Sequence, residues 1–529
     1  MDKNNTRSGI PKEKFEFADR DSTISEKKFN HKPIGYFRDA WNRFRKNKAS
    51  IVAAIIILLI VLYALIVPFL GISEEMNLYY AKKGPRMTWL RAFGIADGGV
   101  DEAFNDLTYI KLLAIGAAAE DRDGTASVSF AEGQTSEYQP VLESQGYTAQ
   151  ALPGGRYKFT YQARVDSYLQ LGFVNMQVTQ SEYAKILEWQ EESGLQVIYP
   201  LIDEKSGYFY SGAPEADKAN YWYKTNQRGA PVSVNEETGQ VTALSLSTDL
   251  RLEDNYLRDA NGDPVYHTYT GGGDIHTAAY KVRVLYYNYY QYRTGSEPNY
   301  LLGTDSQGYD MALRLAKGIR LSLLVAVFVS VINFMIGGIY GAIEGYYGGL
   351  LDLIMERISD ILSGVPFIVV ATLFQIHLAQ KLGPIPGMLF AFVVTGWIGT
   401  ASRMRSQFYR FKNQEYVMAA RTLGARDRRI ILKHIFPNTL GTLITSIALV
   451  IPGVVFNESM LSFLGIVNLG TAETTSLGTL LSDASSIWTN YPHLMIIPAV
   501  VISLMMICFN LFGNGLRDAF NPSLRGVEE

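Results

Sequence analysis

The feature that most limits how this chain can fold is a stretch of twenty uncharged residues at 51–70, IVAAIIILLIVLYALIVPFL. A helix rises 1.5 Å per residue, so this stretch is long enough to cross a hydrocarbon core of about 30 Å. It begins too far from the N-terminus for a cleavable signal peptide, and no small-residue cleavage site follows it. We therefore expect a membrane-spanning helix here.

The remaining hydrophobic sequence lies after residue 301. It predicts five further spans, at 319–343, 361–379, 387–403, 439–457 and 493–514. Six spans place both ends of the chain on the same side of the membrane. Basic residues cluster before the first span and again between the fourth and fifth spans, so the positive-inside rule places these segments and both termini in the cytoplasm.

Residues 73–301, between the first two spans, form a long acidic insert. They contain 30 acidic and 19 basic residues, a net charge of −11, whereas the rest of the chain has a net charge of +8. The overall net charge of −3 therefore averages two unlike parts, and it lacks the basic excess typical of nucleic-acid-binding proteins. With the N-terminus inside, the insert lies outside the cell.

Local patterns predict that the insert is a folded α+β or mostly β domain. Thr179-x-x-Glu182 is a capping box, and it predicts a helix over 181–192 that ends at Gly194. Leu-Pro-Gly-Gly at 152–155 predicts the turn of a β-hairpin. The segments 195–202 and 279–292 have the composition of strands.

The insert contains few residues that suggest a catalytic or metal-binding site. Asp259-x-Asn261-x-Asp263 begins like a calcium loop, but Pro264 and Thr270 stand where such a loop needs glycine and glutamate, so we interpret it as a solvated turn. The chain has no Gly-x-Ser-x-Gly nucleophile motif, and its one cysteine, Cys508, excludes an internal disulfide. We expect neither a catalytic site nor a metal site.

The most informative motif lies in the basic segment 415–438, which begins Glu415-Tyr-Val-Met-Ala-Ala-Arg-Thr-Leu-Gly424 and ends His434-Ile-Phe-Pro437-Asn438. Its small residues allow a short helix to sit closely in a groove, and its cationic residues suit an acidic partner surface. The segment resembles the EAA motif by which ABC importer permeases contact their ATPases. Met418, His434 and Phe436 replace the family's Glu, Ile and Leu. The coupling residues that the resemblance implies are Glu415, Ala419, Ala420, Arg421, Gly424, Ala425, Arg426, Asp427 and Pro437.

A second motif precedes the second span. Its residues are Gly303, Thr304, Asp305, Gly308, Asp310, Arg314 and Arg320. The motif resembles the LGTDxxGRD…R…GxRxSL stretch of C-type oligopeptide and dipeptide permease subunits, with Tyr309 in place of the family's Arg and Leu313 in place of its Ser. Further matches are GYYGG at 345–349, followed by Asp352, then ESMLSFLG at 458–465 and NLFGNGLRDAFNP at 510–522. The resemblance covers about 35–72 and 300–523 and omits the insert.

These patterns divide the chain into parts. We expect a disordered cytoplasmic tail at 1–34, an interfacial helix and first span at 35–72, the insert at 73–301, a permease core at 302–523 and a cytoplasmic tail at 524–529. The resemblance implies a mainly α membrane protein with six spans of the type I ABC importer kind.

The resemblance also implies what the chain does. It would be a non-enzymatic subunit of an ATP-driven peptide importer in a bacterial plasma membrane. The chain has no phosphate-binding Gly-x-x-x-x-Gly-Lys loop, so we expect it to bind no cofactor itself. Its partners would be a second permease subunit, two ATP-binding subunits that hold ATP and Mg²⁺, and an extracellular solute-binding lipoprotein. The resemblance does not extend to the insert; because the insert is large, acidic and placed outside, we expect it to dock that lipoprotein or cap the entry.

Two alternatives remain open. The cargo could be nickel or another small solute, because the binding protein largely selects the cargo. The chain could also be a membrane-anchored ectoenzyme or sensor, although this leaves five spans unexplained. Three polar residues within or near the spans, Asn333, Gln375 and Glu458, are candidates for the translocation path.

Overall fold

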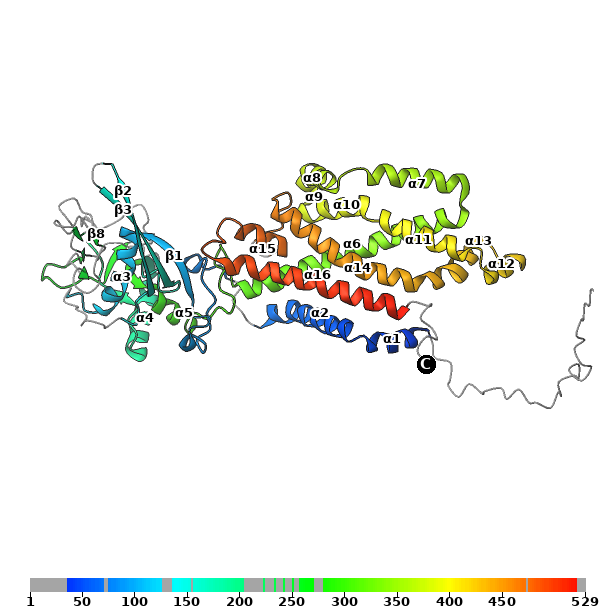
Figure 1. The fold of residues 1–529 in the computed structure, drawn as a ribbon. Helices are drawn as coiled ribbons and strands as arrows, with labels where there is room; N and C mark the ends of the chain where they lie inside the picture. The colour runs from blue at the N-terminus through cyan, green and yellow to red at the C-terminus, as the bar shows by residue number, and fades with distance from the viewer. Residues whose placement is uncertain are drawn as a thin grey trace, which may run out of the picture.

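The computed structural model describes residues 36–70, 75–125, 136–153, 156–203, 256–270, 279–471 and 474–520, and four two-residue strands between 222 and 251. The expected tails at 1–34 and 524–529 lie outside the described residues. The described chain forms an elongated helical bundle with a mixed α/β domain at one end (Figure 1). We call this the insert end of the bundle and the opposite end the basic end.

The bundle begins with α1 (Tyr36–Lys46) and α2 (Lys48–Ile66) and resumes after the insert with α6 to α16. Its later helices are α6 (Met311–Tyr347), α7 (Gly349–Ser363), α8 (Phe367–His377), α9 (Ala379–Leu382), α10 (Pro384–Gly396), α11 (Ile398–Phe411), α12 (Glu415–Thr422), α13 (Asp427–Arg429), α14 (Phe436–Phe463), α15 (Leu477–Ala484) and α16 (Pro492–Phe520). A π-helix, Ile430–Ile435, joins α13 to α14.

Among the described residues, five helical segments are long and apolar enough to cross a membrane: 48–69, 311–347, 384–411, 443–463 and 492–520. The pair α7 and α8 meets the same criterion together but is bent by 74° near Pro366, so it supplies a sixth span if both helices cross as one. Proline lacks the N–H that would continue the helix, which explains the bend. The predicted blocks thus all appear as helices.

The glycines of α6 bring it into close contact with α11. A Cβ atom built on Gly337 would lie 2.8 Å from Thr400 Cβ, and one on Gly341 would lie 2.9 Å from Ala401 Cα. A Cβ on Gly345 would lie 2.7 Å from Phe408 Cβ. Small residues at four-residue spacing allow membrane helices to approach at backbone distance. 

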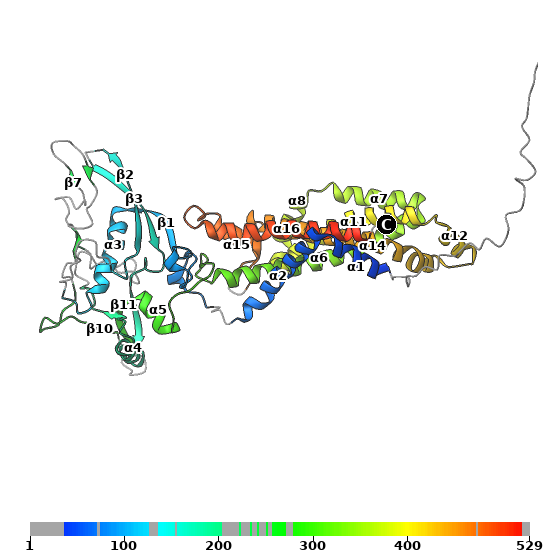
Figure 2. The ribbon, with the colours of Figure 1, turned by 60° about the horizontal axis from the view of Figure 1, so that its bottom comes forward.

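The insert folds around two larger sheets (Figure 2). The first has the antiparallel order β1–β3–β2, from β1 (Gly99–Asn105), β2 (Val141–Leu152) and β3 (Arg156–Asp166), with α3 (Asp106–Glu120) packed against it. The second has the order β10–β11–β4, and β5 also pairs with β11. Its strands are β4 (Phe173–Thr179), β5 (Ile198–Tyr199), β10 (His267–Thr270) and β11 (Ala279–Leu285), and α4 (Gln180–Ser193) and α5 (Tyr286–Thr294) cover it. The short strands Trp222–Tyr223 and Leu250–Arg251 pair with each other, as do Ser233–Val234 and Val241–Thr242.

The structure confirms two local predictions for the insert and corrects two. The Thr179 hydroxyl accepts the Glu182 N–H, and α4 ends at Gly194 in the left-handed conformation. Strands β2 and β3 pair antiparallel on either side of the predicted turn. The predicted strand at 195–202 is wrong beyond Ile198–Tyr199, and the predicted strand at 279–292 becomes helix α5 after Leu285. 

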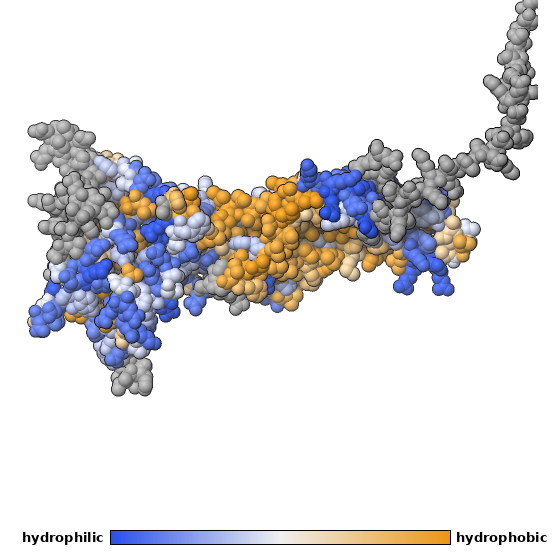
Figure 3. Space-filling view, turned by 90° about the horizontal axis from the view of Figure 1, so that it is seen from below, coloured by the Kyte–Doolittle hydropathy of each residue, from blue (hydrophilic) through white to orange (hydrophobic). Residues whose placement is uncertain are grey.

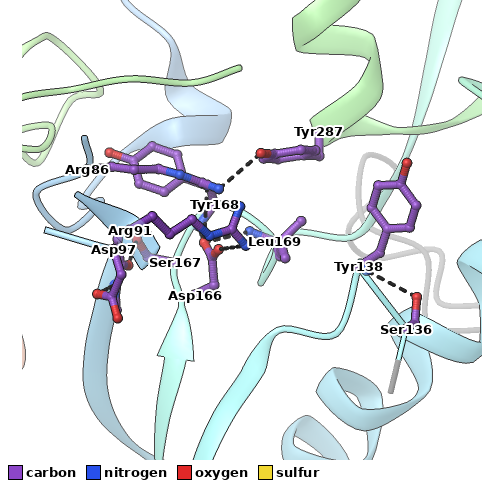
Figure 4. A network of polar contacts seen from close by, with 12 residues as sticks. Arg86, Arg91, Asp97, Ser136, Tyr138, Asp166, Ser167, Tyr168, Leu169 and Tyr287 are labelled. Atoms are coloured by element: carbon purple, nitrogen blue, oxygen red, sulfur yellow. Dashed lines mark hydrogen bonds and ion pairs between the residues drawn. The ribbon is translucent and has the colours of Figure 1, made fainter. Parts of the chain in front are cut away.

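A buried ion pair ties the first residues of the insert to the end of β3 (Figure 4). Arg86 and Asp166 are both fully buried, with 3.4 Å between Arg86 Nη1 and Asp166 Oδ1. Arg86 Nη2 also donates to the Tyr287 hydroxyl at 3.0 Å, and Asp166 Oδ1 accepts the Tyr168 N–H at 3.0 Å. The guanidinium therefore joins segments that lie far apart in the sequence.

Replacing Arg86 by leucine should destabilise the insert by about 3–5 kcal/mol, because a buried carboxylate loses its main partner. Arg293→Leu is the matched control, because Arg293 is 57% exposed and pairs with Glu182 at 3.8 Å, so its loss should change stability by less than about 1 kcal/mol. Hydrogen exchange of the backbone amides of β3 and α5 in the full chain measures the change in stability of both variants. Equal protection in the two variants would contradict this role of Arg86.

Gly341→Ala should lower the thermal midpoint of the detergent-solubilised chain, because the added methyl group overpacks the α6–α11 contact, a change that typically costs about 1–3 kcal/mol. Gly453→Ala in α14 is the control, because a Cβ there meets no atom within 4 Å. The same midpoint in both variants would show that this contact tolerates a side chain.

Candidate functional site

Two of the sequence motifs form compact sites at opposite ends of the bundle. The motif before the second span lies where the insert meets α6, and we call residues 303–314 the clasp. The segment 415–438, which we call the coupling segment, lies at the basic end, where α12 projects beyond the other helices (Figure 1).

The clasp is a hydrogen-bonded turn that starts α6. The Asp305 carboxylate accepts the N–H groups of Gln307 and Tyr309 at 2.9 Å each, and it pairs with Arg314 Nε at 3.1 Å. Asp310 caps the helix by accepting the Ala312 N–H at 2.7 Å. Burial raises the pKa of Asp310 despite this hydrogen bond. Three residues that the resemblance implied, Asp305, Asp310 and Arg314, therefore act together in one turn.

The clasp also pairs with the chain that follows the first span. The Lys82 N–H donates to the Asp305 carbonyl at 2.9 Å, and the Thr304 N–H donates to the Lys83 carbonyl at 3.0 Å. The Thr304 hydroxyl accepts the Lys83 N–H at 2.8 Å and donates to the Tyr80 carbonyl. The buried Lys83 ammonium has its pKa lowered to about 8, because burial disfavours its charge.

The two glycines of the clasp have a direct steric role. Gly303 and Gly308 both have positive φ, 76° and 87°, which side chains rarely adopt. A Cβ atom on Gly303 would collide with the Lys83 carbonyl, and one on Gly308 would collide with the Asn77 carbonyl. The motif thus encodes a close junction between the insert and α6.

Arg320, the last residue of this motif, lies apart from the clasp. It is exposed on α6 and makes no hydrogen bond or ion pair within the described part of the chain. Its face of the helix continues with the exposed apolar residues Leu324, Val327, Phe328 and Val331.

The coupling segment is a broken helix. The resemblance to ABC importer permeases implies a coupling helix over about 420–429, but α12 ends at Thr422, and Gly424 adopts a φ of 79° before α13 begins at Asp427. Pro437 lies in the first turn of α14. Most of the predicted contact residues are exposed: Glu415, Ala419, Arg421, Gly424, Arg426 and Asp427. Ala420 and Ala425 are half-buried, and Leu423 beside them is 88% exposed.

The inner face of the coupling segment is fixed to α6 and α11. Val417 and Ile430 are fully buried in a cluster with Met404 and Phe408. The Tyr346 hydroxyl, in the last turn of α6, donates to Asp427 at 2.6 Å, and Arg421 Nη2 donates to the same hydroxyl at 3.4 Å. The segment therefore presents one face outward while the other face holds the end of α6.

A charged network continues from this end of α6. Arg405 of α11 binds Asp352 of α7 through two nitrogens, at 2.6 and 2.9 Å, and it also binds Glu356 at 2.9 Å. Arg405 Nε lies 3.5 Å from the buried Glu344 of α6. The contact of α6 with α11 thus extends to α7.

The three candidates for the translocation path make hydrogen bonds within the bundle. Asn333 is buried and donates to the Phe392 carbonyl at 3.4 Å, and Gln375 donates to the Pro384 carbonyl at 3.0 Å. Glu458 is fully buried and accepts the hydroxyls of Ser322 at 2.8 Å and Ser462 at 3.2 Å. A role in the path stays a prediction.

Sequence reasoning missed the roles of Tyr346, Arg405 and Asp352. Tyr346 and Asp352 lie in or beside the quoted GYYGG stretch, whose second and third glycines, Gly348 and Gly349, have positive φ and separate α6 from α7.

Within the described residues, no group of three or more His, Cys, Asp or Glu side chains could hold a metal ion. Asp259 uses its carboxylate to accept the N–H groups of Asn261 and Asp263.

Comparison with known proteins finds family matches on both sides of the insert, and one of them includes the coupling segment. The family described as the binding-protein-dependent transport system inner membrane component matches residues 334–526. The N-terminal membrane domain of oligopeptide transport permease C matches residues 35–85. Neither match includes residues 86–333.

Relatives of known name match about two fifths of the chain. A dipeptide transport system permease protein of Bacillus subtilis is 43% identical over 225 residues, which are 42% of this chain and 68% of that protein. An oligopeptide transport system permease protein of Haemophilus influenzae is 43% identical over 231 residues, 43% of this chain and 72% of that protein. A solved methionine ABC transporter in an inward-facing conformation has 17% identity and a TM-score of 0.34, over 40% of this chain and 98% of the solved chain. The relatives and the family matches together show that the chain is a multi-pass membrane protein that belongs to the oligopeptide and dipeptide permease C family.

Proposed function

We propose that this chain is one of two transmembrane subunits of an ATP-driven importer of oligopeptides or dipeptides. Its named relatives are permease proteins of oligopeptide and dipeptide transport systems. The single observation that most supports the proposal is the shape of the coupling segment, which projects from the basic end with Ala419 and Gly424 exposed and its apolar face buried. A surface of this kind suits a groove on a partner protein.

The proposed partners are a second permease subunit, two ATP-binding subunits and a solute-binding lipoprotein. ATP and Mg²⁺ bind to the ATP-binding subunits, and this chain performs no chemical step. Closure of the ATP-binding subunits moves α12, and the contacts of Asp427 and Arg421 with Tyr346 carry that movement to α6. The bundle then changes from an inward-open to an outward-open state.

The basic end faces the cytoplasm in this proposal, in agreement with the positive-inside rule. The coupling segment and the helix before it carry nine basic residues between Arg403 and Lys433 and only two acidic ones, Glu415 and Asp427. The insert lies at the opposite end of the bundle (Figure 1), so in this proposal it lies outside the cell. There it docks the solute-binding lipoprotein or caps the entry, two roles that the deletion described below separates.

Membership of the permease family favours a transporter over a membrane-anchored enzyme or sensor. Import of nickel or another small solute is the second candidate, because the cargo depends largely on the binding protein. Mass spectrometry of the ligand carried by the co-purified lipoprotein distinguishes a peptide from a metal ion.

Gly424→Trp should uncouple transport from ATP hydrolysis while the complex still assembles. Gly424 has open space around it, so a large side chain there projects toward the proposed partner. We expect peptide uptake to fall by about tenfold or more, since coupling free energies of a few kcal/mol correspond to such factors. Uptake by proteoliposomes and ATPase rates provide the measurement.

Gly424→Asn is the matched control, because asparagine tolerates positive φ and adds little bulk. It should transport nearly as well as the wild type. Equal loss in both variants would mean that backbone strain, rather than bulk at an ATPase contact, causes the defect. Wild-type uptake by Gly424→Trp would contradict the assignment of the coupling segment.

A deletion of the insert tests its role. Because the Arg86 N–H donates to the Tyr300 carbonyl at 2.8 Å, residues 87–299 can be replaced by a Gly-Gly turn that leaves the clasp intact. If the insert docks the lipoprotein, the deletion weakens lipoprotein binding and lowers uptake at limiting lipoprotein. If the insert caps the entry, binding persists while peptide leaks or basal ATPase activity rises. Unchanged uptake, binding and basal ATPase activity would contradict both roles.

A further inference from the structure

Exposed apolar side chains of the insert gather close to its first residues. Four of the five most exposed large hydrophobic residues in the described part of 75–300 are Leu78, Trp89, Phe93 and Ile95. Trp89 is 70% exposed, Phe93 75% and Ile95 60%. Among the described residues of the insert, most other aromatic side chains pack into its core, as the tyrosines of α5 do. The loop 87–96 carries the two most exposed rings of this described part, Phe93 and Trp89.

The loop 87–96 is held in one shape rather than left as a loose connection. The Met87 N–H donates to the Ala96 carbonyl at 2.7 Å, and Arg86 and Asp97 form a bridge at its base. A 3₁₀ turn over Arg91–Phe93 ends at Gly94, which has a φ of 67°. Arg91 Nη2 lies 3.5 Å from Asp166 Oδ2, next to the buried pair formed with Arg86 (Figure 4). The fold thus presents Trp89, Phe93 and Ile95 outward at fixed positions.

The position of this loop follows from the clasp. The preceding residues pair with the start of α6, through the Asn77 N–H to the Gly308 carbonyl at 3.2 Å and the Lys82 N–H to the Asp305 carbonyl at 2.9 Å. The loop therefore begins close to the start of α6. The end of α2 packs there as well, since the Tyr63 hydroxyl donates to the Ala312 carbonyl at 2.9 Å. There Phe69 and Leu70 are 80% and 64% exposed and continue the apolar outer surface of α2. Apolar side chains extend from the bundle onto the adjacent end of the domain (Figure 3).

We propose that the loop 87–96 is a membrane anchor, which places Trp89, Phe93 and Ile95 in the interface of the leaflet on the insert side. Tryptophan is favoured at this depth, because its ring is apolar and its N–H reaches water or headgroups. The lipid occupant follows from continuity with the lipid-facing surface of α2. Anchoring fixes the insert in one orientation above the bundle. This inference does not depend on the cargo or on the ATPase contact, so it can fail independently of the proposed function.

Spin labels test the anchor in the complete permease complex in lipid nanodiscs. In a Cys508→Ala background, Phe93→Cys is labelled and compared with Tyr269→Cys on β10, a position of similar exposure, 61%, on the other sheet of the insert. For each label, the measured quantity is the ratio of its collision rate with oxygen to its collision rate with a water-soluble nickel chelate. We expect this ratio to be severalfold higher at 93 than at 269. Equal ratios at the two positions would overturn the proposal. Low collision with both reagents at 93 would also overturn it, because it would mean that protein covers the loop.

A conservative variant gives a second readout. Trp89→Phe keeps the apolar side chain and should fold, while removing the proposed interfacial indole. We expect phospholipids brominated in the upper part of the acyl chain to quench the tryptophan fluorescence of the wild type more than that of this variant. The control Trp189→Phe on α4 should leave the quenching unchanged. Identical quenching in the wild type and in Trp89→Phe would overturn the proposal.

Discussion

The contact between α6 and α11 is the interaction on which the rest of the bundle depends. Membrane helices gain little from hydrophobic burial against one another, so close packing and polar contacts must hold them together. Gly337, Gly341 and Gly345 remove the side chains that would separate the two backbones. This approach brings Arg405 to within 3.5 Å of Glu344 and allows it to bind Asp352. The last turn of α6 contains Tyr346, whose hydroxyl donates to Asp427 and so holds the coupling segment.

Helix α6 connects the two candidate sites. It begins at the clasp, where Asp310 caps it and Thr304 pairs with Lys83, and it ends at the coupling segment 37 residues later. Displacement of α12 and displacement of the insert would therefore act on the same helix. In the proposed transporter, α6 is the element through which nucleotide-driven movement reaches the junction with the insert. A rigid helix is well suited to such transmission, because its backbone hydrogen bonds are satisfied along its length.

Much of this organisation is predictable from sequence, because local rules dominate there. Uncharged runs predict the spans, and the Thr179 cap and the pairing of β2 with β3 follow from local signals that tertiary contacts do not override. The strand predicted at 279–292 fails after Leu285, because Tyr286 and Tyr287 are buried in the domain core as part of a helix. The coupling helix fails as one unit, because Gly424 takes a positive φ and divides it. The Arg86–Asp166 pair joins residues 80 positions apart, which no local pattern indicates.

The central claim is that the coupling segment contacts an ATP-binding subunit. Site-specific photo-crosslinking from Leu423, the most exposed large hydrophobic side chain of that segment, tests it directly in the reconstituted complex. The account predicts that a photoreactive residue at 423 forms a covalent adduct with the ATP-binding subunit, and that ATP changes the yield. A residue at 269 on the insert should form no such adduct. Absence of the adduct at 423 in a complex that contains the ATP-binding subunits would contradict the account.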